Sequence, residues 1–154
     1  LYRGCKSYRM SVKRLTPKGH AKAFVDKQMA LKRQVIINNY MNVGEAALEV
    51  ARTQHKYHRQ TGNLTSSTGY CILDNGKVLV MSNFEVVGNG KKGAEEGHKF
   101  LRKLISENSK GLVFIMVAGM SYANYVEAMS LDVLESAEML SKKMLPKLCK
   151  ALKL

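Results

Sequence analysis

The fold class follows from residues 69–83, which read Gly69-Tyr70-Cys71-Ile72-Leu73-Asp74-Asn75-Gly76-Lys77-Val78-Leu79-Val80-Met81-Ser82-Asn83. Two runs rich in β-branched and other apolar residues, 69–73 and 77–83, flank a polar turn. An Asn-Gly pair adopts the positive φ angles of a tight hairpin turn at low cost. The stretch therefore predicts two antiparallel strands joined by a short turn.

A long helical segment precedes this hairpin. Thr16-Pro17 is typical of a helix start, because Thr can cap free amide groups and Pro fits the first turn. Apolar residues then recur at helical spacing as far as Ile36, with lysines between them. We expect Gly44 to bend or break the helix, which then resumes over 45–57. The sequence thus predicts one long helix, or two nearly collinear ones, ending before Thr61.

The pattern after the hairpin alternates between strand and helix. It predicts a third strand piece at 85–87, a flexible glycine- and lysine-rich loop at 88–93, a helix at 94–108 and a buried strand at 112–117.

A final helix closes the chain. We expect Ser130 to cap it and Pro146 to kink or end it, because Pro removes a backbone donor and clashes with the preceding turn. Together the elements predict an α+β fold, in which a mostly antiparallel sheet of three to five strands packs against a long N-terminal helix and a C-terminal helix. With 154 residues, we expect a single domain over 16–154, preceded by an arm at 1–15.

The charge is concentrated in that arm and in the helix after it. The chain has 25 Lys and Arg against 12 Asp and Glu, a formal net charge of +13, and residues 1–33 hold ten of the cations and one acid. We expect the arm to contact an anionic partner, either nucleic acid or an acidic protein surface, through Arg3, Lys6, Arg9, Lys13 and Arg14. A solvated arm without a partner is the alternative.

Two classes of protein are disfavoured by composition. No run of about 18 apolar residues is present, so we expect no membrane-spanning helix. Cys5, Cys71 and Cys149 are odd in number and far apart, which argues against a disulfide framework and against a zinc site. We expect no metal.

Residues 88–93 spell G-x-G-x-x-G between a strand and a helix, the local context of a dinucleotide-binding loop. However, Ala118-Gly119-Met120 follows the next strand where an acid should hold a ribose, and a hairpin implies an antiparallel sheet. A Walker loop is also excluded, because Lys92 stands where Ser or Thr is needed. We therefore expect a loop and no cofactor.

Catalytic residue patterns are equally weak. His55 and His58 lie three apart on the expected helix, but further metal ligands are missing at a supporting spacing. A G-x-S-x-G nucleophile elbow is absent and the acids are scattered. We expect no catalytic residues and no enzymatic activity.

Two segments carry a resemblance to a known family. One is the joint between the long helix and the hairpin, Arg59-Gln60-Thr61-Gly62-Asn63-Leu64-Thr65-Ser66-Ser67, and the other is Tyr122-Ala123-Asn124-Tyr125-Val126-Glu127. They resemble the R-x-T-G-x-L-x-x-S and Y-A-x-Y-V-E segments of the tail-component, or tail-completion, family of long-tailed bacteriophages. Their order along the chain agrees with that family, over about residues 20–152.

The resemblance implies a structural virion protein made in the cytoplasm of a host bacterium. It would form a closed homo-oligomeric ring, sixfold or twelvefold, that joins or completes the tail at the head–tail interface, contacts other neck, connector or tail proteins and leaves a passage for DNA. The implied subunit and partner contacts are Thr61, Asn63, Tyr122, Tyr125, Val126 and Glu127. Independently of the family, Gly62 can adopt a left-handed conformation that stops the helix, and Leu64 can pin the joint to the core.

One departure from the family pattern concerns the residues after Glu127. Relatives often continue with an aromatic residue and Gly-Thr, whereas this chain has Ala128-Met129-Ser130-Leu131. The chief alternative function is a stand-alone basic nucleic-acid-binding protein, because Tyr2 and Tyr8 lie among the cations of the arm and could stack on bases. Motifs of a dedicated nucleic-acid reader are absent from the sequence.

Overall fold

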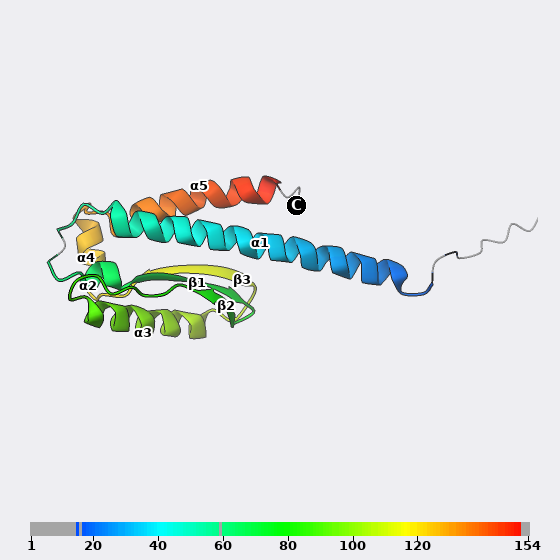
Figure 1. Cartoon of the computed structure of the whole chain (residues 1–154), viewed down its shortest axis with the longest axis horizontal. Helices are drawn as coiled ribbons and strands as arrows, with labels where there is room; N and C mark the ends of the chain where they lie inside the picture. The colour runs from blue at the N-terminus through cyan, green and yellow to red at the C-terminus, as the bar shows by residue number, and fades with distance from the viewer. Residues whose placement is uncertain (1–14, 16, 59, 152–154) are drawn as a thin grey trace, which may run out of the picture.

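The computed structural model describes residues 15, 17–58 and 60–151. It is an α+β fold with a long N-terminal helix, a C-terminal helix and a three-stranded antiparallel sheet, which confirms the predicted class (Figure 1). The elements along the chain are α1 (His20–Thr53), α2 (Asn63–Ser66), β1 (Thr68–Asp74), β2 (Lys77–Met81), α3 (Lys91–Glu107), β3 (Leu112–Ala118), α4 (Ala123–Ala128) and α5 (Glu135–Ala151). The cations of the predicted arm, Arg3 to Arg14, lie outside the described residues.

The sheet has the order β2-β1-β3, and both neighbours pair antiparallel to the central strand β1. The predicted hairpin turn is confirmed: Asn75 and Gly76 have φ angles of 49° and 79°. Side chains alternate across β1. Cys71 and Leu73 pack with Leu101 of α3, whereas Tyr70 and Ile72 pack with Leu48 of α1 on the other face.

Helices cover both faces of this sheet. In Figure 1, α3 lies below it and α1 lies above it, with α5 alongside α1. Ala47 and Ala51 of α1 meet Ala137 of α5, and all three are buried. Small side chains at these positions allow the two helix backbones to approach closely.

The long helix differs from its prediction at two points. It runs unbroken through Gly44, because this glycine serves a close contact and does not act as a break: a Cβ there would lie 2.5 Å from Cε2 of the Tyr70 ring. The helix also ends at Thr53 and not near Tyr57. His55 therefore lies after the helix, where its ring stacks on that of Tyr57 at a centroid distance of 4.1 Å.

The segment between β2 and α3 was also predicted incorrectly. Residues 85–87 form no strand, and α3 begins at Lys91, so residues 91–93 are helical where a flexible loop was expected. Hydrogen bonds hold the segment in place. The Ser82 Oγ accepts the Tyr70 amide at 2.8 Å, and the Ser66 Oγ accepts the Val87 amide at 2.8 Å. These side-chain partners replace the strand pairing that the sequence pattern suggested.

The C-terminal helix begins later than expected and continues further. Ser130 has a φ angle of 58° and precedes α5 by several residues, so it is not the cap. Asp132, which also precedes the helix, accepts the Ser136 amide in its first turn through Oδ1 at 2.9 Å. Pro146 lies inside α5 without ending it, at the loss of one backbone donor.

Membrane-spanning helices and metal-binding groups of side chains are both absent from the described part of the chain. None of its helices is long and apolar enough to cross a bilayer. No group of three or more His, Cys, Asp and Glu within the described ranges is placed to hold a metal ion.

The buried thiol of the central strand gives a first testable prediction. Burial raises the pKa of Cys71 from 9.0 to about 11, whereas Cys149 is exposed. Since the thiolate is the reactive form, an alkylating reagent at pH 8 should modify Cys149 in the folded protein and leave Cys71 unmodified. Both should react in denaturant. Peptide mapping by mass spectrometry measures the labelling of each cysteine and distinguishes Cys5 from the other two. Equal labelling of Cys71 and Cys149 under native conditions would contradict the burial of Cys71.

Candidate interaction surface

The two segments that carry the family resemblance meet at one end of the molecule, where α2 and α4 lie close together in Figure 1. They line a shared cavity of about 310 Å³. Four of the six predicted contact residues, two from each segment, line it: Thr61, Asn63, Tyr122 and Val126. Segments that are about 60 residues apart in the sequence thus form one local surface.

The joint at residues 61–66 is built from a glycine and a set of short polar side chains. Gly62 is left-handed, with a φ of 79°, but it precedes α2, and α1 has already ended at Thr53. The Asn63 Oδ1 accepts the Gly93 amide at 3.1 Å and so attaches the joint to the start of α3. Leu64 packs with Ala123 and Val133, which confirms that it pins the joint to the core.

This packing also explains Gly90 and Gly93, two of the three glycines of 88–93. A Cβ at Gly93 would lie 1.9 Å from the Asn63 carbonyl oxygen, and one at Gly90 would lie 2.1 Å from the Ser66 Oγ. The amide of Gly93 is already donated to Asn63. These glycines therefore let α3 approach α2. This packing accounts for them without a phosphate-binding role.

Helix α4 divides its residues between the core and the surface. Ala123 is buried, while Tyr125 is 69% exposed and Met129 is 55% exposed. Tyr122, Tyr125 and Met129 recur at spacings of three and four, so they share one side of the helix. Partial burial raises the pKa of Tyr122. We call these three residues the α4 face; Met129 was missed from the sequence although its spacing from Tyr125 signals it.

Glu127, by contrast, is directed into its own chain. Its Oε2 accepts the backbone amides of Val133 at 2.6 Å and Leu134 at 3.0 Å, and its Oε1 accepts that of Glu135 at 3.0 Å. Val133 and Leu134 directly precede α5, and Glu135 is its first residue. Backbone amides at the start of a helix have no carbonyl acceptor within the helix. The structure therefore gives Glu127 an intrachain role as a helix cap.

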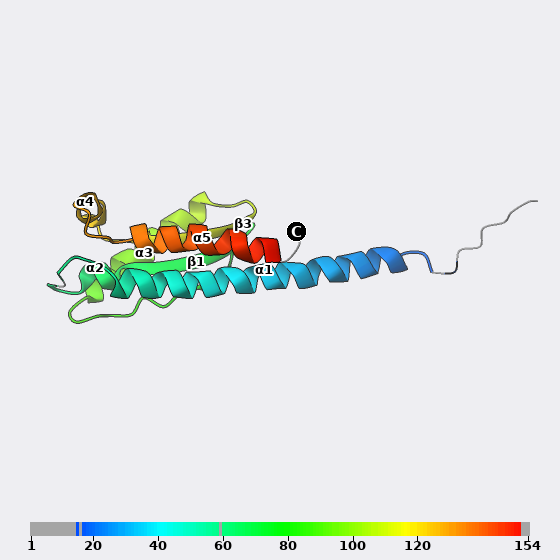
Figure 2. The same ribbon diagram turned by 90° about the horizontal axis from the view of Figure 1, so that it is seen from above.

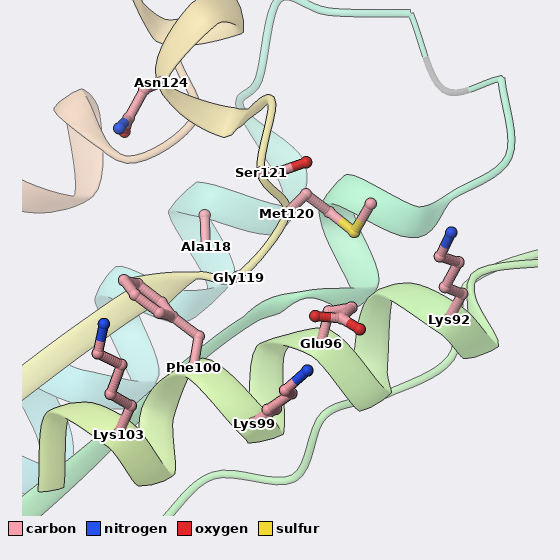
Figure 3. Close-up of a pocket in the computed structure, with 10 residues that line it drawn as sticks. All are labelled: Lys92, Glu96, Lys99, Phe100, Lys103, Ala118, Gly119, Met120, Ser121 and Asn124. Carbon is pink, nitrogen blue, oxygen red and sulfur yellow. The ribbon is translucent and has the colours of Figure 1, made fainter. Parts of the chain in front are cut away.

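A larger hollow lies on the other side of the segment that leads into α4 (Figure 3). It has a volume of about 640 Å³ between α3 and residues 118–124. Phe100, Ala118 and Met120 contribute its apolar part. Its charged lining is Lys92, Lys99, Lys103 and Glu96. Ser121 is the one hydroxyl-bearing residue in this lining.

Another group of charged side chains lies between α1 and the sheet. Arg52 donates to the carbonyl oxygens of Thr68 and Asn83, at 3.2 and 3.0 Å, and to Glu85 at 3.0 Å. Desolvation lowers the pKa of Arg52, and the nearby carboxylates oppose that shift. The Tyr70 hydroxyl donates to Glu45 at 2.6 Å. Each of these contacts ties α1 to the sheet and its flanking segment, so the cluster has a structural role.

No family model, no curated protein and no solved structure matches this chain.

Proposed function

We propose that this chain is a structural subunit of the neck or upper tail of a long-tailed bacteriophage. It would assemble into a homo-oligomeric ring at the head–tail joint and leave an axial passage for DNA. The observation that carries the proposal is that both family-like segments converge on one end of the fold and leave the α4 face exposed there. Aromatic and methionine side chains are enriched at protein–protein interfaces.

The arrangement supports a contact with another subunit for a physical reason. Tyr122, Tyr125 and Met129 expose apolar surface beside a cavity, and hydrophobic burial favours covering such surface. A closed ring needs a heterologous contact, in which this face meets a different surface of the next subunit. The ring would be part of the virion, with other neck, connector or tail proteins as neighbours.

A stand-alone nucleic-acid-binding protein is the second candidate, and the observation that favours it is charge. The net charge is +13, and the cations of the first half of α1 are exposed, as is Lys18 just before it. Phosphate contacts of this kind give strong but salt-sensitive binding.

The two candidates predict different solution behaviour. For a neck subunit we expect closed rings in negative-stain images and a multiple of the 17.2 kDa chain mass by size exclusion with light scattering. A monomer at all concentrations that binds DNA tightly, with affinity falling steeply as salt rises, would contradict the ring and favour the alternative.

Variants tie the ring to the proposed surface. Tyr125→Ser should raise the protein concentration needed for ring assembly by about tenfold or more, because it removes an exposed aromatic side chain from the contact. Met139→Ser is the matched control, since Met139 is similarly exposed, on α5, and lies outside the α4 face. Equal effects of the two substitutions would place the contact elsewhere.

A further inference from the structure

The first half of α1 projects away from the body of the protein. Both views show it extending beyond the ends of the sheet and of α5 (Figures 1 and 2). Every described residue from Leu15 to Val35 is exposed, whereas Val43, Gly44, Ala47, Leu48 and Ala51 of the second half are buried. At 1.5 Å per residue, the 34-residue helix is about 50 Å long, and none of the described elements covers roughly half of it.

This projecting half carries an apolar stripe with coiled-coil spacing. Its members are separated by three and four residues in alternation: Ala21, Phe24, Gln28, Leu31 and Val35. Alternation of three and four is the heptad pattern that places side chains along one helix seam. Phe24 is 59% exposed and Leu31 is 54% exposed, so the seam is open. Gln28 is the polar member, of the kind that fixes register in a coiled coil.

The stripe points away from the sheet. Arg33 forms an ion pair with Asp74 at the end of β1, which orients its side of the helix toward the sheet. At about 100° per residue, Gly44 and Ala51 share that side with Arg33, and both are buried. Leu31 and Val35 lie about 160° from Arg33 by the same arithmetic. The fold therefore cannot cover the stripe by packing α1 more tightly on its own sheet.

The charges beside the stripe are all positive. In the heptad register set by the stripe, Lys27 occupies the g position and Lys32 the e position. The single acid of this half, Asp26, lies on the far side at f. A parallel pair of two copies would set Lys27 of one opposite Lys32 of the other, and an antiparallel pair would also bring lysines together. A second copy is thus disfavoured, and a partner with acidic flanks is complementary.

The geometry points to a docking helix: residues 20–35 form one helix of an intermolecular coiled coil. The other helix is an amphipathic helix of a different protein, with Glu or Asp at its e and g positions. Association is favoured by preorganisation, because the second half of α1 is anchored in the core and propagates the helix without a new nucleation step. DNA complements the lysines but leaves Phe24 and Leu31 uncovered. The inference stands independently of the neck proposal, because it concerns the opposite end of α1.

The test uses the full chain and two synthetic helical peptides of about three heptads, both with leucine at the seam. One peptide carries glutamate at its e and g positions and the other carries lysine there. Fluorescence anisotropy measures binding of each labelled peptide. We expect the glutamate peptide to bind about tenfold or more tightly than the lysine peptide. The double substitution Lys27→Glu and Lys32→Glu should reverse that preference.

A second pair of variants tests the seam itself. Phe24→Ser with Leu31→Ser should weaken binding of the glutamate peptide by about tenfold or more. Val86→Ser with Met139→Ser is the control, because these residues are 54% and 66% exposed on other surfaces. Circular dichroism and thermal unfolding verify that both doubles fold.

Three outcomes would overturn the inference. They are equal binding of the two peptides, self-association of the wild-type chain that depends on Phe24 and Leu31, and binding to duplex DNA or to anionic phospholipid vesicles that depends on the same two residues. None of them bears on the Tyr125→Ser result, so failure here and failure of the ring proposal remain distinguishable.

Discussion

Replacing Gly62 with alanine is expected to lower the free energy of unfolding by about 3 kcal/mol or more. Two penalties add. The φ of 79° disfavours any residue with a Cβ, which costs about 1 to 2 kcal/mol. The new Cβ would also lie 2.0 Å from the Val87 carbonyl oxygen. That oxygen cannot simply retreat, because it accepts the Gly90 amide at 3.0 Å, and the Val87 amide is bonded to Ser66.

A matched control separates these penalties. Gly111 has a φ of 76°, and nothing lies within 4 Å of the place its Cβ would take. Gly111→Ala should therefore cost only the conformational part, about 1 to 2 kcal/mol. Urea unfolding followed by circular dichroism measures both. Equal losses for the two variants would mean that the Val87 carbonyl yields freely and that the joint is not held by the close packing described above.

What could be predicted from the sequence was the structure that local chemistry dictates. Asn75-Gly76 sets its own turn whatever surrounds it, so the hairpin and its antiparallel pairing were predicted correctly. Long apolar-periodic segments gave the two main helices. Together these determined the α+β class.

The errors arose where a distant residue decides the local structure. Gly44 was expected to break α1, but its role depends on the Tyr70 ring, 26 positions later. Residues 85–87 look like a strand, yet Ser66 takes the Val87 amide. Periodicity carries no information about such partners.

The site shows the same division. The segments at 59–67 and 122–127 were recognised as motifs, but only the fold shows that Thr61, Asn63, Tyr122 and Val126 line one cavity. The projecting seam on α1 has a visible heptad spacing, but its exposure depends on where the sheet and α5 end, which the sequence pattern does not state.

Glu127→Ala is the second substitution expected to have a large effect, with a loss of about 2 to 4 kcal/mol in the free energy of unfolding. It leaves three amides at the start of α5 without their acceptor. The effect should spread, because α5 packs on α1 through Ala137. Glu127→Gln keeps one acceptor oxygen and turns an NH₂ group toward backbone donors, so an intermediate loss is expected.

The control is another glutamate, on α5 itself. Glu138 forms an exposed ion pair with Lys142 one turn further along, so Glu138→Gln should cost about 0.5 kcal/mol or less. Urea unfolding of the dissociated chain, combined with light scattering of the assembled one, separates the two roles open to Glu127. If Glu127 is a cap, its removal lowers the stability of the single chain before it affects assembly. A residue that touches a neighbouring subunit would leave the unfolding midpoint unchanged and disrupt assembly alone, and that outcome would return Glu127 to the interface that the motif implied.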